Sequence, residues 1–144
     1  MAKSFLLEIV TPEKLFYNGK AELLIARTLS GDEGFMAGHS WGCKLLGTGE
    51  LLFRETGSND FRIAAISGGF IDIRDYILVF TDSAEWPEEI DVERANAAIA
   101  REQEWLSRHD SPEESKEEIE EHIQAAKRAE NRQKVAAGGR RQRH

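Results

Sequence analysis

Hydrophobic and polar residues alternate in short runs through the first part of the chain. Phe5, Leu7 and Ile9 are separated by single residues, so their side chains fall on one face of an extended strand. Pro12 ends this run because proline donates no ladder hydrogen bond. Further predicted strands lie at 14–17, 21–28, 50–54, 62–67, 70–74 and 76–81. The last of these, YILVFT, is an apolar run typical of a buried strand.

Glycine punctuates these runs. The dipeptide Asn18-Gly19 predicts a tight hairpin, since both residues tolerate positive φ. Between residues 31 and 49 six glycines stand close together, which favours turns, bulges and close backbone approach. Gly68-Gly69 is interpreted as a bulge and not as a phosphate loop, because no helix follows it. The pattern indicates an antiparallel sandwich or barrel over roughly the first 84 residues.

The period changes beyond Trp86. One helical face collects Val92, Ala95, Ala98, Ile99, Trp105 and Leu106. Asp91 is a suitable N-cap because its carboxylate accepts from free amides of the first turn. Ser111, Pro112 and Glu114 form a capping box that predicts a second helix start. The second helix would carry Ile119, Ile123, Ala126 and Ala129 on one face and end before Gly138.

Two helices joined by a short capped turn make an antiparallel hairpin. The predicted fold class is therefore α+β, with a β-sandwich over 1–86, a helical hairpin over 87–137 and a basic, disordered tail over 138–144. The hairpin seam is mainly alanine, which buries little area at about 25 cal/mol per Å² of apolar surface. We expect such a hairpin to be marginally stable alone, as a movable element would be.

Charge divides along the second helix. Residues 110–122 hold seven acidic residues and one lysine, whereas 127–144 hold seven lysines or arginines and one glutamate. One interpretation is a solvated helix face followed by a disordered basic tail. The other is a hairpin that docks onto an acidic protein surface. The sequence alone leaves both open.

Composition excludes several classes of protein. The net charge of −7 argues against a general nucleic-acid binder. The single cysteine excludes an intramolecular disulfide and favours a reducing compartment. No apolar run approaches a membrane span, and Glu8 interrupts the candidate core of a signal peptide. These features predict a soluble, cytosol-facing protein.

Candidate chemistry is sparse. His39 and Cys43 share a glycine-rich loop, but no third group stands at a spacing that would orient a nucleophile and base. One cysteine and four scattered histidines do not suggest a metal site. Arg128 and Arg132, one turn apart, share a helix face and could clamp phosphate oxygens. The residues by themselves do not suggest an enzyme.

Five segments in order, LLEIVTPEKLFYNG, GDEGFMAGH, ISGGFIDI, EEIDVERA and KRAENR, resemble the ε subunit of F-type ATP synthases. The resemblance spans nearly the whole chain. It implies a sandwich of about ten short strands followed by a two-helix hairpin. It also implies a non-catalytic subunit of the central stalk, whose sandwich binds the γ subunit and the membrane ring of c subunits. That position would couple rotation of the ring to ATP synthesis at the cytoplasmic face of a bacterial plasma membrane, with membrane association only through the complex.

The resemblance assigns the hairpin a regulatory role. In bacterial members an extended hairpin inserts along γ toward an acidic loop of the β subunits and inhibits ATP hydrolysis. Some members bind ATP in the compact state as a regulatory ligand. The resemblance implies no required cofactor. Matched by motif, the ATP-binding residues would be Glu85, Ile90, Asp91, Arg94, Ala95, Arg128 and Arg132. A ligand that binds only the compact form shifts the equilibrium toward it.

The resemblance further implies that a loop near Asp32 and His39 contacts the c-ring. This loop departs from the family pattern, with Met36-Ala37-Gly38-His39 and then Trp41-Gly42 in place of Leu-Pro-Gly-His and a Pro-Leu pair. The turn between the helices is also a few residues longer than in compact members. Two alternatives belong to other classes: a free-standing ATP-responsive sensor of the same fold, and a small hydrolase using Cys43.

Overall fold

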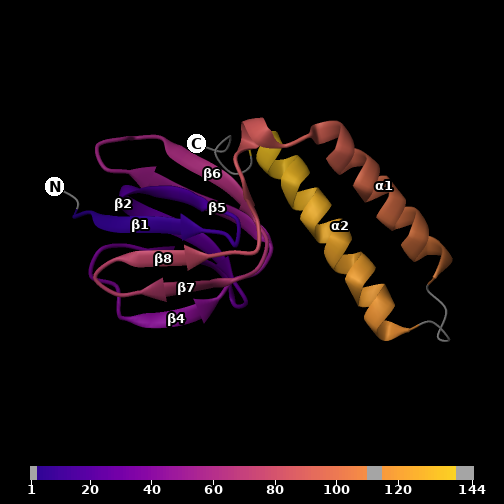
Figure 1. The fold of residues 1–144 in the computed structure, drawn as a ribbon, viewed down its shortest axis with the longest axis horizontal. Helices are drawn as coiled ribbons and strands as arrows, with labels where there is room; N and C mark the ends of the chain where they lie inside the picture. Colours follow the sequence, from indigo (N-terminus) through magenta and orange to yellow (C-terminus); the bar gives the residue numbers. More distant parts are fainter. Residues whose placement is uncertain (1–2, 110–114, 139–144) are drawn as a thin grey trace.

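A computed structural model describes residues 3–109 and 115–138 (Figure 1). Its strands are β1 (Phe5–Val10), β2 (Leu15–Thr28), β3 (Gly31–Phe35), β4 (Gly42–Leu45), β5 (Gly49–Glu55), β6 (Phe61–Ile66), β7 (Phe70–Ile73), β8 (Ile77–Phe80) and β9 (Ala84–Glu85). The helices are a short 3₁₀ helix η1 (Pro87–Glu89), α1 (Val92–Arg108) and α2 (Lys116–Ala136). The predicted order of sandwich and helical hairpin is confirmed, with nine strands in the described residues where the resemblance implied about ten.

The long strand β2 overturns the predicted hairpin at Asn18-Gly19. The strand runs through both residues, which pair with Glu8 and Leu7 of β1. A Cβ atom at Gly19 would overlap the Tyr17 hydroxyl, so this glycine provides space for a side chain and not a turn. The turn lies earlier, where the Thr11 hydroxyl accepts from the amides of Glu13 and Lys14, each at 3.3 Å.

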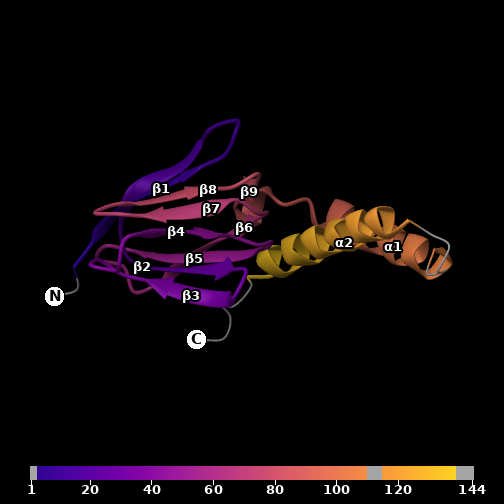
Figure 2. The ribbon, with the colours of Figure 1, turned by 90° about the horizontal axis from the view of Figure 1, so that it is seen from below.

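Strand β2 also links the two layers of the sandwich. Its first half pairs with β1, and its second half pairs with β3 and β5. One layer is therefore β4-β7-β8-β1, and the other carries β3, β5, β6 and β9 around the second half of β2 (Figure 2). All pairs are antiparallel except β1 with β8. These two strands are far apart in sequence, so no hairpin constrains their relative direction.

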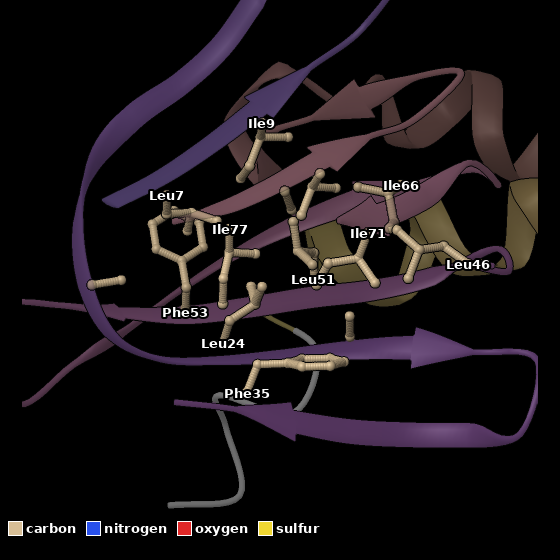
Figure 3. Packing of buried hydrophobic residues seen from close by; sticks show 14 of the residues in the cluster. Leu7, Ile9, Leu24, Phe35, Leu46, Leu51, Phe53, Ile66, Ile71 and Ile77 are labelled. Carbon is tan, nitrogen blue, oxygen red and sulfur yellow. The ribbon is translucent and has the colours of Figure 1, made fainter. Parts of the chain in front are cut away.

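The core lies between the two layers (Figure 3). Leu7, Ile9, Leu24, Phe35, Leu51, Phe53 and Ile71 are among its fully buried side chains. Strand β8 is buried on one face only, since Ile77 and Val79 enter the core while Phe80 is exposed. The predicted burial of 76–81 is thus correct for alternate residues, because no described element covers the outer face of this layer.

The helices pack as the predicted antiparallel hairpin. The Asp91 cap is confirmed, because its carboxylate accepts from the Arg94 amide at 3.0 Å. Val92 is 44% exposed and does not belong to the buried seam, whereas Ala95, Ala126 and Ala129 do. Helix α2 is capped by Ser115, which accepts from the Glu118 amide.

Some predicted features cannot be compared with the structure. The predicted capping box of Ser111, Pro112 and Glu114 lies outside the described residues, as does the basic tail beyond Gly138. Within the ranges that are described, no helix has the length and apolar character to cross a membrane.

Candidate functional site

A cavity of about 290 Å³ lies where the helical hairpin meets the sandwich. Ser67, Ser83 and Glu85 line it from the sandwich, Arg101 and Glu102 from α1, and Arg128 and Arg132 from α2. Three guanidinium groups against two carboxylates give the lining an excess of positive charge. Forked N–H donors of this kind suit phosphate or carboxylate oxygens.

The ion pair between Glu85 and Arg132 crosses this cavity. Arg132 donates from Nε to Glu85 Oε1 at 2.7 Å and from an Nη atom to Oε2 at 3.0 Å. Strand β9 positions Glu85, which lies opposite Ala65 of β6 in the sheet. Arg128, one helical turn before Arg132, is exposed, and its side chain forms no hydrogen bond or ion pair with any described residue. The two predicted arginines therefore differ: one is already engaged by a carboxylate and the other is not.

Four predicted site residues lie close by but do not line the cavity. Ile90 is buried in an apolar cluster with Val135 of α2. Asp91 caps α1, Arg94 is exposed in the first turn, and Ala95 is buried in the helical seam. The structure thus brings Glu85, Arg128 and Arg132 together, and it gives the motif around Asp91 the geometry of a helix start.

Two charged residues of the cavity lining were missed by the sequence interpretation, Arg101 and Glu102. Arg101 follows Arg94 by seven residues, and this two-turn spacing on one helix face is a signal that could have identified it. Glu102 carried no such signal, because a charged residue in a helix is usually assigned to solvent. It is only 8% exposed and bonds His122 of α2. No cluster of potential metal ligands occurs in the part of the chain that the structure describes.

The two residues expected to contact the c-ring lie at opposite ends of β3. Asp32, at its start, bonds Arg27 at 2.7 Å and lines a groove shared with Lys127 and Lys134 of α2. His39 follows the strand and lines a separate hollow with Met36 and Trp41. The structure does not bring Asp32 and His39 together.

A second candidate surface is the outer face of the layer containing β1. We call Leu45, Phe70, Phe80, Val10 and Leu15 the apolar row, since each lies opposite the next on adjacent strands from β4 to β2. Phe70 and Phe80 stack with centroids 5.4 Å apart. Leu45 is 60% and Leu15 54% exposed. Contiguous exposed apolar side chains of this kind mark interaction surfaces.

Cys43 lies beside this row. It is exposed on β4 and stands opposite Asp72 of β7, on the same outer face. An exposed position on a flat sheet face differs from the enclosed, oriented surroundings of a catalytic thiol.

Comparison with known proteins identifies the family. Residues 4–87 match the family model described as ATP synthase, Delta/Epsilon chain, beta-sandwich domain. The ATP synthase epsilon chain of Alkaliphilus oremlandii is 44% identical over 108 residues, covering 74% of this chain and 79% of that protein. The epsilon chain of Ruminococcus albus is 40% identical over 134 residues, covering 92% and 96%.

A solved structure has the same fold. It is the Euglena gracilis mitochondrial ATP synthase, described as OSCP/F1/c-ring, in which one chain superposes with a TM-score of 0.75 and 23% identity. The match covers 89% of this chain and 78% of that one. By its family model and its relatives, the chain belongs to the epsilon chains of ATP synthase, which are non-catalytic subunits of that enzyme.

Proposed function

We propose that the chain is a central-stalk subunit that couples rotation of the c-ring to ATP synthesis, with its sandwich bound to the γ subunit and to the ring. The observation that carries the proposal is the apolar row. Its five strands span roughly 19 Å at the usual strand spacing, which is wide enough for a stable protein contact. Stacked Phe70 and Phe80 at its centre are suitable anchors for a partner. In this proposal the loop that contains His39 and Trp41 contacts the c-ring, at the cytoplasmic face of the membrane.

The single cysteine provides the test of the γ contact. Cys43 is the only cysteine in the chain and is exposed beside the apolar row. We expect its labelling by a maleimide to slow by about tenfold or more when the cognate γ subunit binds. We also expect Phe70→Asp to weaken γ binding at least tenfold, because it places a charge in the buried centre of the contact.

The matched control for this experiment is Leu29→Asp. Leu29 is also a large, exposed apolar residue, but it lies in the turn after β2 and away from the apolar row. We expect this variant to bind γ normally. The proposed stalk contact is wrong if γ does not slow the labelling of Cys43 and if Phe70→Asp leaves the affinity for γ unchanged.

The hairpin is the regulatory part of the proposal. Exposed Lys127, Arg128 and Lys134 give the second half of α2 a basic surface that complements an acidic loop of the β subunits. In an extended position this surface inhibits ATP hydrolysis. In the folded position Arg128 and Arg132 of α2 line the cavity at the base of the hairpin. ATP binds there as a regulatory ligand and favours the folded state. The cavity lies at the lower end of the usual size of ligand pockets, roughly 300–1,000 Å³, so a nucleotide must widen it.

Calorimetric titration with ATP tests the ligand. We expect ATP to bind and Arg128→Ala to weaken this binding by about tenfold, because the Arg128 guanidinium can donate hydrogen bonds to phosphate oxygens. Lys127→Ala is the control, since it removes an equal charge from a neighbouring residue that lines a different groove. Absence of heat at millimolar ATP would remove the ligand from the proposal and leave the stalk role intact.

A further inference from the structure

The contacts that dock the hairpin on the sandwich come from the end of α2. Arg132 bonds Glu85 through two atoms, and the Asn131 side chain donates to the Gly49 carbonyl at 2.9 Å. Val135, one turn further, is fully buried against Leu52 and Ile63. Figure 1 shows this end of α2 against the sandwich, while the other end of the hairpin projects away from it.

These contacts differ in what they specify. Burial of Val135 favours contact but sets no direction, because apolar attraction is non-directional. The Asn131 bond goes to a backbone carbonyl, so the identity of residue 49 matters little to it. The Glu85–Arg132 pair is two-pronged and joins side chains 47 residues apart, so it fixes both the register and the rotation of α2 on the sheet.

We propose that Glu85 and Arg132 form a latch that holds the ligand-free hairpin on the sandwich, and that an anionic ligand displaces Glu85 from Arg132. A guanidinium has two two-pronged edges, and Glu85 occupies the edge formed by Nε and one Nη of Arg132. A triphosphate that approaches the remaining edge meets the negative charge of the Glu85 carboxylate, and this repulsion sets Glu85 and the ligand in competition for Arg132. The first part stands on the contacts alone, whereas the second rests on the ligand site of the proposed function.

Distances between two spin labels test the latch. The labels are placed on exposed positions of the full chain, Asn59→Cys in the sandwich and Glu120→Cys in α2, with Cys43→Ser. Without ligand we expect a narrow distance distribution that broadens in Glu85→Gln and in Arg132→Gln. The double variant should broaden it no further than either single variant, because both remove the same interaction. Glu88→Gln is the control, since it removes an exposed carboxylate three residues away.

Two results would overturn the latch. One is a narrow distribution in both single variants. The other is additive broadening in the double variant, which would show that the two residues act separately. Circular dichroism of each variant confirms that the helices remain folded, so that loss of docking is separated from loss of structure.

Inorganic triphosphate tests the displacement of Glu85. We expect Glu85→Gln to bind it about fivefold more tightly than the unmodified chain, because the competing carboxylate has been removed. Equal or weaker binding by Glu85→Gln contradicts displacement. Absence of triphosphate binding by both proteins also overturns it, and that result leaves the latch to be decided by the spin-label distances alone.

Discussion

Trp86 ties the junction between the two parts of the chain to the sandwich. Its ring stacks on Phe16 with centroids 4.3 Å apart, and the Arg62 guanidinium lies 4.0 Å from its centroid. Each contact of this type adds to the attraction from simple apolar burial. Trp86 therefore belongs to the sandwich, and any swing of the hairpin must pivot after it, near η1 and Asp91.

Tyr17, in the same aromatic group, makes a pH-dependent contribution to stability. Burial, followed by its 2.8 Å hydrogen bond to Glu55, raises the pKa of Tyr17 to about 12. An unfolded tyrosine ionises near pH 10. Between those values the unfolded chain releases a proton that the folded chain retains, so this contribution is present below pH 10 and is lost as the pH rises toward 12.

We expect Tyr17→Phe to reduce the loss of stability over this pH interval. At neutral pH the variant should be less stable by about 1 kcal/mol, because its hydrogen bond to Glu55 is gone. Urea unfolding at several pH values measures both effects. Tyr76→Phe removes the other, exposed tyrosine and is the control; an equal change in its pH profile would contradict the assignment to Tyr17.

At the scale of elements, the hairpin seam has two different halves. Near the sandwich it is built of buried alanines, as the sequence pattern predicts. Toward the turn, Trp105 stacks against both His109 and His122, with centroids 4.0 and 3.6 Å away. His122 also bonds the buried carboxylate of Glu102. This half of the seam is aligned by polar and aromatic contacts, which specify the register of the two helices.

We expect His122→Ala to destabilise the hairpin by roughly 1–3 kcal/mol, because it leaves the buried Glu102 carboxylate with only Arg101, 4.0 Å away. Replacing both residues, Glu102→Leu with His122→Leu, should be less harmful than His122→Ala. Thermal unfolding followed by helical circular dichroism measures the difference. Arg108→Ala, which removes an exposed pair with Glu104, should change stability by less than about 0.5 kcal/mol. A similar small effect of His122→Ala would show that the buried pair does not hold the seam.

At the scale of the whole molecule, one apolar cluster stabilises the sandwich and a second joins the hairpin to it. The main cluster lies inside the sandwich and draws on no residue after Trp86. The second is small and joins Leu52, Ile63 and Ala65 of the sheet to Ile90 and Val135. The sandwich thus has a complete core without the hairpin, whereas the hairpin is held by few apolar contacts. A rigid body with a separable arm is the arrangement that the proposed regulation requires.

Local patterns failed where longer-range packing opposed them. Asn18-Gly19 has the composition of a turn, yet pairing with β1 holds it extended. Val92 matches the apolar helical face but is exposed, and Glu102 is polar but buried. In each case the neighbour that decides the outcome is distant in the chain, so a short window of sequence does not contain it.

The sequence by itself determined β1, β5, β6, β7 and β8, the two helices, the Asp91 cap and the change of structure after Trp86. These depend on periodicity, caps and turn chemistry within a few residues, and the ordered motifs added the family. Only the tertiary structure decided which residues meet: Glu85 with Arg132, Glu102 with His122, and the members of the apolar row. Such contacts depend on strand register and on how the helices pack, and neither is encoded in the local alternation of polar and apolar residues.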